Sequence, residues 1–252
     1  MESSEPAASS DLVFNTVEKL GRRIVRGDVA PGATLPVEQA ICDELGVSRN
    51  VVREAVKTLA GKNLIRSARR AGTIVEPQES WNLLDPQVIT WMLEEQPTRE
   101  TVLNALSELR AIIEPEAAAL AAKRASTEQT LKLFQIYEQM KLHARNSERA
   151  VEFDVAFHRA VLEATGNMLL RTFSHGFGML LGANFNLSIQ VNNAFIRNLD
   201  DHRLIAEAIR DRDPERARAV SQALLAKNEA DIREMRATRE QGLTAEGAQD
   251  AG

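Results

Sequence analysis

The apolar residues near the start of the chain recur at the spacing of an α-helix. Four of them, from Val13 to Ile24, lie three or four positions apart, and Gly27 follows, which predicts one helix with a single buried face. Two shorter helical patterns come next, on either side of a tight turn at residues 46–48. Two β-prone segments then flank a polar loop at residues 67–72, as in a hairpin. The order helix, helix, turn, helix, hairpin indicates a winged helix-turn-helix.

The rest of the chain shows helical patterns and no strand pattern. Residues 80–97 are predicted to form a linker with one short apolar helix, and residues 98–236 an antiparallel helical bundle. The polar ends predict a disordered N-terminus at residues 1–11 and a flexible tail at residues 237–252. The expected fold class is therefore mainly α, with an N-terminal winged helix-turn-helix at residues 12–79 and a C-terminal all-α bundle.

Charge divides unevenly between these two parts. Residues 12–79 hold 11 Lys or Arg against 8 Asp or Glu, a net charge of +3, so the remainder of a chain of net charge −5 carries −8. A basic module beside an acidic one is typical of a DNA-binding protein with a regulatory domain. Cys42 is the single cysteine, and no signal peptide or membrane-spanning run is evident. These features favour the reducing cytoplasm and no membrane partner.

The third predicted helix carries residues suited to reading DNA. Its apolar stripe faces the core, so Arg49, Asn50 and Arg53 point away from the core near the N-terminal end of the helix. Arginine pairs with guanine, and asparagine with adenine, through two hydrogen bonds in the major groove. Arg69 and Arg70, at the hairpin tip, can reach phosphates or the minor groove. Charge alone would favour plain solvation of these side chains, but the complete helix-turn-helix and wing favour DNA binding.

These segments resemble a known family. The matching motifs are Leu35-Pro36-Val37-Glu38, the run from Leu45 to Ala55, Leu64-Ile65 and Gly72-Thr73. Together they resemble the GntR family of winged-helix transcription regulators over nearly all of residues 12–76. The resemblance implies DNA contacts from the helix that Ser48 begins, mainly by Arg49 and Arg53, and a wing near Arg70 and Gly72 in the minor groove. Family members often carry arginine where this chain has Gln39.

The second domain contains a set of residues that suits a metal ion. Asp154 and His158 lie one helical turn apart on an inward-facing stripe, and His202 lies on the inward stripe of a later helix. One carboxylate and two imidazoles can bind a divalent metal and leave positions open for a ligand. The Asp–His pair alone would also fit a structural hydrogen bond. Zinc is the first expectation, and nickel or manganese are possible, because the ligand types do not choose among them.

A second resemblance covers roughly residues 98–236. The motifs are Glu108-Leu109-Arg110 through Glu114-Pro115, the run Asp154 to His158, Asp201-His202-Arg203 and Arg212-Asp213-Pro214. They look like the FCD ligand-binding domain of the FadR-type GntR subfamily. By that resemblance the matching Asp and His positions bind metal, often beside a carboxylate effector. Another family histidine corresponds to Leu224 here, which implies a three-ligand site that water or effector completes.

Three residues are candidates for effector binding. Arg110 lies beside inward-facing leucines and can pair with a carboxylate, although a salt bridge within the bundle is the competing interpretation. Asn184 and Asn186 can bind hydroxyl groups, or can simply make a dimer interface polar. The segment from Trp81 to Trp91 is similar to that of galactonate-operon repressors, which points toward sugar acids.

The sequence thus predicts a metabolite-responsive transcription regulator and no enzyme. We expect a repressor of a sugar-acid catabolic operon, which a small carboxylate effector releases from a palindromic operator. A homodimer is expected because one short recognition helix reads too few bases for a genomic site. The alternatives are a metal-dependent enzyme with two histidines and one carboxylate, and a metal-free regulator that responds to a lipid. The enzyme would leave the DNA-binding module unexplained, and the lipid would require an apolar tunnel without an inward Asp/His set.

Overall fold

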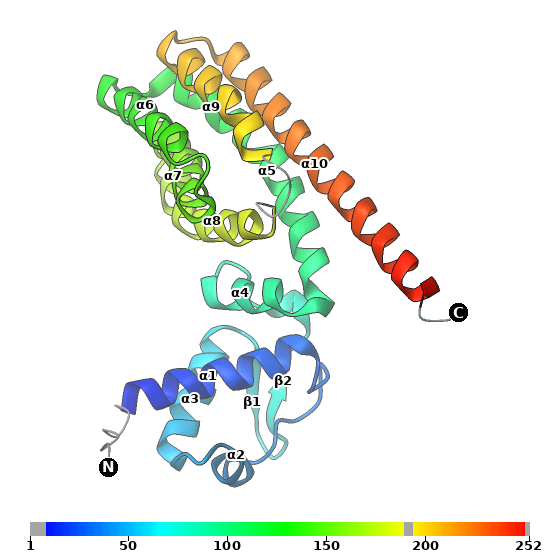
Figure 1. The fold of residues 1–252 in the computed structure, drawn as a ribbon. Coiled ribbons are helices and arrows are strands. Elements are labelled where there is room, and N and C mark those ends of the chain that lie inside the picture. The colour runs from blue at the N-terminus through cyan, green and yellow to red at the C-terminus, as the bar shows by residue number, and fades with distance from the viewer. Residues whose placement is uncertain (1–8, 189–193, 250–252) are drawn as a thin grey trace, which may run out of the picture. The chain divides into compact units, whose positions relative to one another are not determined.

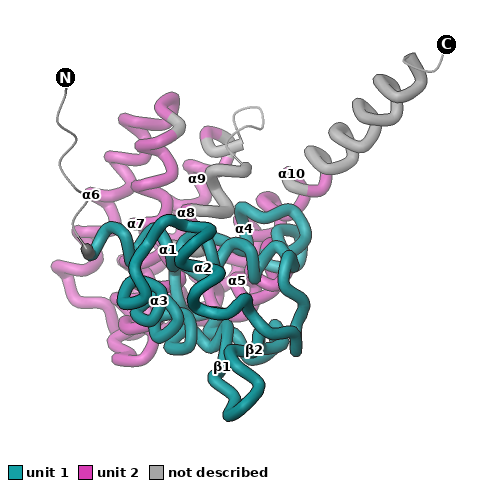
Figure 2. The backbone as a smooth tube through the Cα atoms, turned by 90° about the horizontal axis from the view of Figure 1, so that it is seen from below, with its two compact units in different colours: residues 1–102 teal, residues 103–252 magenta. Residues whose placement is uncertain are grey.

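The computed structural model describes residues 9–188 and 194–249 and divides into two compact units, residues 1–102 and residues 103–252. Figure 1 shows the elements in chain order, and Figure 2 colours the two units. Both units are dominated by helices, and the strands of the described part form a single two-stranded sheet. Within the described ranges, no helix is long and apolar enough to cross a membrane.

The first unit is a winged helix-turn-helix, as the sequence predicts. It contains α1 (Ser9–Arg26), α2 (Glu38–Leu45) and α3 (Arg49–Gly61), followed by β1 (Ile65–Ala68) and β2 (Gly72–Val75). The two strands pair antiparallel from Ile65 opposite Val75 to Ala68 opposite Gly72. Helix α1 already begins at Ser9, so residues 9–11 are helical, whereas the sequence predicted a disordered segment up to residue 11.

Local chemistry explains the sharp turn between α2 and α3. Gly46 ends α2 with φ 67°, a left-handed conformation that glycine adopts without steric cost. Two residues later, the Ser48 side chain accepts a hydrogen bond from the Val51 backbone N–H and thereby caps α3. Val52 and Leu59 are fully buried, so the α3 face opposite them turns to solvent. The turn and cap therefore fix which α3 residues are exposed.

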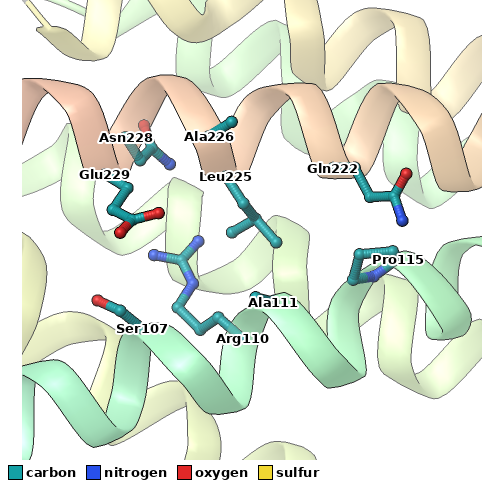
Figure 3. A pocket seen from close by; sticks show the side chains of 9 residues that line it. All are labelled: Ser107, Arg110, Ala111, Pro115, Gln222, Leu225, Ala226, Asn228 and Glu229. Atoms are coloured by element: carbon teal, nitrogen blue, oxygen red, sulfur yellow. The ribbon is translucent and has the colours of Figure 1, made fainter.

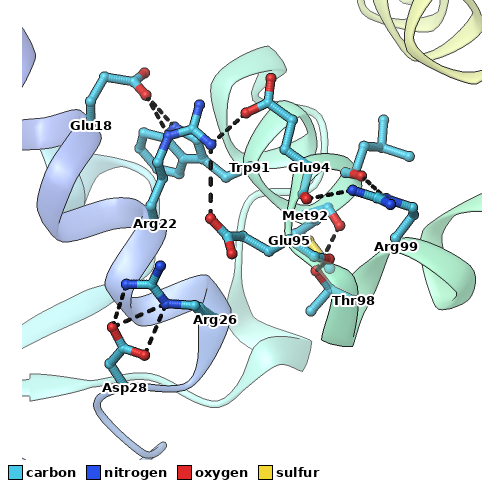
Figure 4. Close-up of polar contacts among 11 residues, drawn as sticks. Glu18, Arg22, Arg26, Asp28, Trp91, Met92, Glu94, Glu95, Thr98 and Arg99 are labelled. Atoms are coloured by element: carbon cyan, nitrogen blue, oxygen red, sulfur yellow. Dashed lines mark hydrogen bonds and ion pairs between the residues drawn. The ribbon is translucent and has the colours of Figure 1, made fainter. Parts of the chain in front are cut away.

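Residues 80–97, expected to be a linker, contain a helix that packs within the first unit. After the short 3-10 helix Gln78–Ser80, α4 (Pro86–Glu94) lies against α1. The fully buried Trp91 ring packs on Gly21, where any Cβ would overlap the ring, and its indole N–H donates to Glu18. Figure 4 shows this contact beside the ion pairs of Arg22 with Glu94 and Glu95.

The second unit is a helical bundle. The boundary between the units falls inside α5 (Gln96–Arg124), and the remaining helices are α6 (Thr127–Leu142), α7 (Ser147–Ala164), α8 (Met168–Ser188), α9 (Ala194–Arg210) and α10 (Pro214–Gln249). Helix α7 packs between α6 and α8, and α9 packs on α6 and α10. A capping box of Ser126 and Gln129 is present at the start of α6. Helix α10 continues to Gln249, so the expected flexible tail from residue 237 is helical over most of its length.

Candidate DNA-reading surface and metal centre

The N-terminal part of α3 presents the predicted base-reading residues. Arg49, Asn50 and Arg53 are all exposed there, while neighbouring Val51 and Val52 are buried. This is the orientation that a recognition helix needs, because its N-terminal side chains reach base edges in the major groove. The arrangement follows directly from the helical period of the buried residues.

The predicted wing residues lie at the tip of the hairpin between β1 and β2. Arg69, Arg70 and Gly72 are all exposed. Arg70 and Gly72 both have positive φ, 71° and 84°, so the chain makes a tight left-handed reversal there. Such a reversal is uncommon for arginine, and it turns the two neighbouring arginine side chains outward at the end of the hairpin.

Three predicted metal ligands converge inside the second unit. Asp154 and His158 come from α7 and His202 from α9, and one ligand atom from each lies within 4.8 Å of the others. His202 Nε2 is 3.1 Å from Asp154 Oδ1, and His158 Nε2 is 3.5 Å from Asp154 Oδ2. All three side chains are buried. The helical bundle thus brings together residues from two helices that are more than forty positions apart in sequence.

Two neighbours orient the imidazole rings. The Nδ1 of His202 lies 2.8 Å from the Asn198 carbonyl oxygen, which can only accept a hydrogen bond, so Nδ1 carries the proton. His158 Nδ1 lies 2.9 Å from Glu114 Oε2 and donates to it. Each ring therefore directs its Nε2 toward Asp154. Supporting groups of this kind fix the tautomer of metal-binding histidines.

The unfilled hydrogen-bonding capacity of the cluster fits a cation. Within the described residues, Asp154 Oδ2 and His202 Nε2 are buried polar atoms without a hydrogen-bond partner. With the single proton of a neutral imidazole on Nδ1, His202 Nε2 would present a lone pair to Asp154 Oδ1, 3.1 Å away, and two acceptors repel each other. A divalent cation would satisfy both atoms at once.

Without a cation, protonation balances this buried charge. Burial disfavours the charged imidazole of His158, but the carboxylates of Glu114 and Asp154 outweigh burial and raise the pKa of His158 to about 9. Burial likewise opposes ionisation of Asp154 and Glu114. The charge of His158 nevertheless holds the pKa of Asp154 below its ordinary value, and Arg110 together with His158 lowers the pKa of Glu114 to about 2. A bound cation would take the place of the proton on His158 Nε2.

Arg110 connects this cluster to a cavity. Its Nε donates to Glu114 Oε1 at 2.6 Å, and its Nη2 lies 3.5 Å from His158 Nε2. The intrahelical salt bridge that the sequence left open as the competing interpretation is therefore formed. The guanidinium also lines a cavity of about 290 Å³ between α5 and α10, which Figure 3 shows. The cavity walls are formed by Ser107, Arg110, Ala111, Pro115, Gln222, Leu225, Ala226, Asn228 and Glu229.

The other two predicted effector residues belong to α8. The side chains of Asn184 and Asn186 lie outside the part of the chain that the structure describes, so their role stays a prediction. Sequence reasoning did not single out Glu114 and Asn198, which support the two histidines. Glu114 lies four residues after Arg110 on one helix, and residues at this spacing are neighbours on the helix surface. This spacing could have indicated that Glu114 pairs with Arg110. The role of Asn198 could not be found, since its backbone carbonyl makes the contact.

A winged helix-turn-helix joined to a helical unit with a buried set of one carboxylate and two imidazoles that could hold a cation defines the class of ligand-responsive DNA-binding regulators. The chain belongs to the GntR family of bacterial regulatory proteins: residues 14–75 match that family, and residues 105–227 match the FCD domain. It is therefore a transcription regulator rather than an enzyme, and FCD domains can bind metals. The alternative of a metal-dependent enzyme is not favoured.

Two relatives from Escherichia coli K12 match along most of the chain. The uncharacterized HTH-type transcriptional regulator YieP is 34% identical over 89% of this chain and 97% of its own. The galactonate operon transcriptional repressor is 31% identical over 86% of this chain and 94% of its own. Among solved structures, Lar, which controls the expression of the Listeria monocytogenes agr system, has a TM-score of 0.57 at 14% identity. It covers 92% of this chain and 99% of its own, a likeness of fold alone.

Proposed function

We propose that this regulator represses a sugar-acid catabolic operon and leaves its operator when a small carboxylate binds the helical unit. The observation that carries the proposal is the buried cluster of Asp154, His158 and His202 beside Arg110, whose guanidinium also lines a cavity. The volume of this cavity, about 290 Å³, is near the lower end of the volumes of ligand-binding pockets. The similarity to a galactonate operon repressor supports a sugar acid as the effector class. Such a regulator acts in the cytoplasm, where its operator is.

The proposed metal is zinc, with nickel or manganese as the other possibilities. Three protein ligands leave coordination positions open, and a bound divalent ion would attract a carboxylate or hydroxyl oxygen there. Arg110 would provide a second, positively charged contact for the carboxylate. The polar lining from Ser107, Gln222 and Asn228 suits hydroxyl groups better than an acyl chain. This lining and the buried Asp/His set speak against the lipid-responsive alternative.

In the proposed DNA complex, a homodimer places two α3 helices in successive major grooves of a palindrome. Ser48 holds the start of the helix, Arg49, Asn50 and Arg53 read base edges, and Arg69, Arg70 and Gly72 form the wing contacts. Arg49→Ala and Arg53→Ala should each weaken binding to a selected duplex by about 1–3 kcal/mol. Unchanged affinity of both variants at matched salt would contradict the assignment of α3.

The effector proposal is tested by release of DNA. The wild-type protein first selects a duplex from a random library, and anisotropy then follows dissociation of that labelled duplex as sugar acids, galactonate among them, are added. The effector can change the affinity of the dimer for DNA only if it binds one geometry of the dimer more tightly than another. His202→Ala and Arg110→Ala should still bind the duplex but should not release it.

A control separates loss of sensing from general damage to the helical unit. Arg218 forms surface ion pairs with Glu116 and Glu215 in the same unit, so Arg218→Ala should respond like the wild type. Normal release by both His202→Ala and Arg110→Ala would mean that the sensing pocket lies elsewhere. Elemental analysis of purified wild type and Asp154→Ala should find metal in the first and a loss of metal in the second.

A further inference from the structure

A polar relay on α2 holds the first recognition arginine. Arg49 donates from both Nε and Nη2 to the single oxygen Gln39 Oε1, at 3.1 and 2.7 Å. Gln39 Nε2 in turn donates to Asp43 Oδ1 at 2.7 Å. The three side chains therefore form a chain of hydrogen bonds from α2 to the start of α3.

Asp43, the acceptor at the end of these hydrogen bonds, determines which way the side-chain amide of Gln39 faces. A carboxylate can only accept, so the NH2 group of Gln39 must face Asp43 and its oxygen must face Arg49. The contact occupies the Nε edge of the guanidinium. The Nη1–Nη2 edge then remains to pair with O6 and N7 of a guanine.

The second recognition arginine is held in a similar way by a different group. Arg53 Nε lies 3.1 and 3.3 Å from the two carboxylate oxygens of Glu38. Each arginine therefore has its own acceptor on α2, a neutral amide for Arg49 and a charged carboxylate for Arg53. The resemblance to the GntR family leads one to expect at position 39 an arginine that can contact DNA itself. This chain has Gln39 there, which accepts hydrogen bonds from Arg49.

We propose that Gln39 and Asp43 are positioning residues that set the base preference of Arg49. The proposal rests on the proposed role of α3 in reading DNA. A long arginine side chain has many rotamers, and holding one of them in advance lowers the entropy lost when it pairs with a base. Gln39 thus acts on specificity through Arg49 rather than through its own contact with DNA.

The test compares base discrimination rather than total affinity. The probe is the duplex that the wild-type protein selects from a random library, together with duplexes that differ from it by one base pair. Arg49→Ala identifies the base pair that Arg49 reads, because discrimination there is lost. Gln39→Ala should reduce discrimination at that same base pair by about threefold to tenfold, the range expected for one net hydrogen bond.

A double-mutant cycle shows whether Gln39 works through Arg49. In an Arg49→Ala background, adding Gln39→Ala should change discrimination no further. Asp43→Ala should give a smaller loss at the same base pair, because the amide is then free to turn. Glu44→Ala is the control on the same helix, since Glu44 pairs with Arg23, and discrimination should be unchanged.

Three outcomes would overturn the positioning role. Gln39→Ala could leave discrimination unaltered, could alter a different base pair, or could retain its effect without Arg49, which would mean direct contact with DNA. If Arg49→Ala itself leaves discrimination intact, the assignment of α3 as the reading helix fails as well, and this result is distinct from the first three.

Discussion

At the scale of single residues, the proposed metal centre depends on groups outside its three candidate ligands. Glu114 holds His158 through Nδ1 and at the same time neutralises Arg110. The Asn198 backbone carbonyl likewise holds His202 through Nδ1, but this carbonyl carries no charge. Because these contacts set which nitrogen bears the proton, they decide whether the rings can present lone pairs toward Asp154.

Replacing the Glu114 carboxylate should weaken metal binding without removing a ligand. For Glu114→Gln we expect zinc affinity, measured by competition with a chelating dye, to fall by about 10- to 100-fold. Glu116→Gln is the matched control, since Glu116 lies two residues along the same helix and pairs at the surface with Arg218. Equal zinc affinity of Glu114→Gln and wild type, with both folded by circular dichroism, would show that Glu114 does not support the site.

At the scale of elements, the contact between α1 and α4 makes α4 part of the DNA-binding unit. Trp91 is fully buried against Gly21, and Glu18 accepts hydrogen bonds from Trp91 and Gln87. Both tryptophans of the chain, Trp81 and Trp91, lie in this unit. Tryptophan fluorescence therefore reports unfolding of the first unit alone.

Gly21→Ala should destabilise the first unit, because the added Cβ would overlap the buried Trp91 ring. Overpacking of this kind costs about 1–3 kcal/mol, measured by urea unfolding with tryptophan fluorescence. Gly61→Ala is the control, because a Cβ at Gly61, the last residue of α3, meets nothing within 4 Å. A midpoint for Gly21→Ala as high as that of Gly61→Ala would contradict the close packing of α1 on α4.

The same contact should make the first unit sensitive to acid. Burial would raise the pKa of Glu18, but hydrogen bonds from Gln87, Trp91 and Arg22 outweigh burial and lower that pKa below its ordinary value. A carboxyl group whose pKa is lower in the folded state stabilises the fold at pH values above its pKa in the unfolded state. This stabilisation is lost as the pH falls through the pKa of the folded state.

The measurement compares melting temperatures of wild type and Glu18→Gln by tryptophan fluorescence from about pH 6 to about pH 3. The wild type should melt higher at the upper end, and the difference should shrink as the pH falls. A difference that stays constant over this range would mean that the Glu18 charge does not stabilise the contact.

At the scale of the whole molecule, the proposed function requires two copies of the chain. One α3 exposes only a few side chains that are proposed to read bases, too few for a unique site in a genome. We therefore expect light scattering to give twice the chain mass of 27.9 kDa, both for the free protein and on a palindromic duplex. A duplex with one half-site should bind much more weakly, and a monomer in both measurements would contradict the prediction.

The sequence by itself determined the elements and most of the chemistry. The helical period, Gly46 and Ser48 were enough to predict the reading helix and its exposed arginines, because caps and periodicity act between near neighbours. The same reasoning predicted the inward stripe of Asp154 and His158. At the two ends the structure adds helix that local polarity did not predict, since residues 9–11 belong to α1 and α10 continues to Gln249.

Only the tertiary structure decided which distant groups meet. No local pattern shows that Trp91 packs on Gly21, that Glu114 orients the imidazole of His158, or that Gln39 faces Arg49. These contacts join residues of different helices, so they follow from how helices pack rather than from spacing along one of them. Burial then sets the energetics, since the cluster around Asp154 must balance its charge without water.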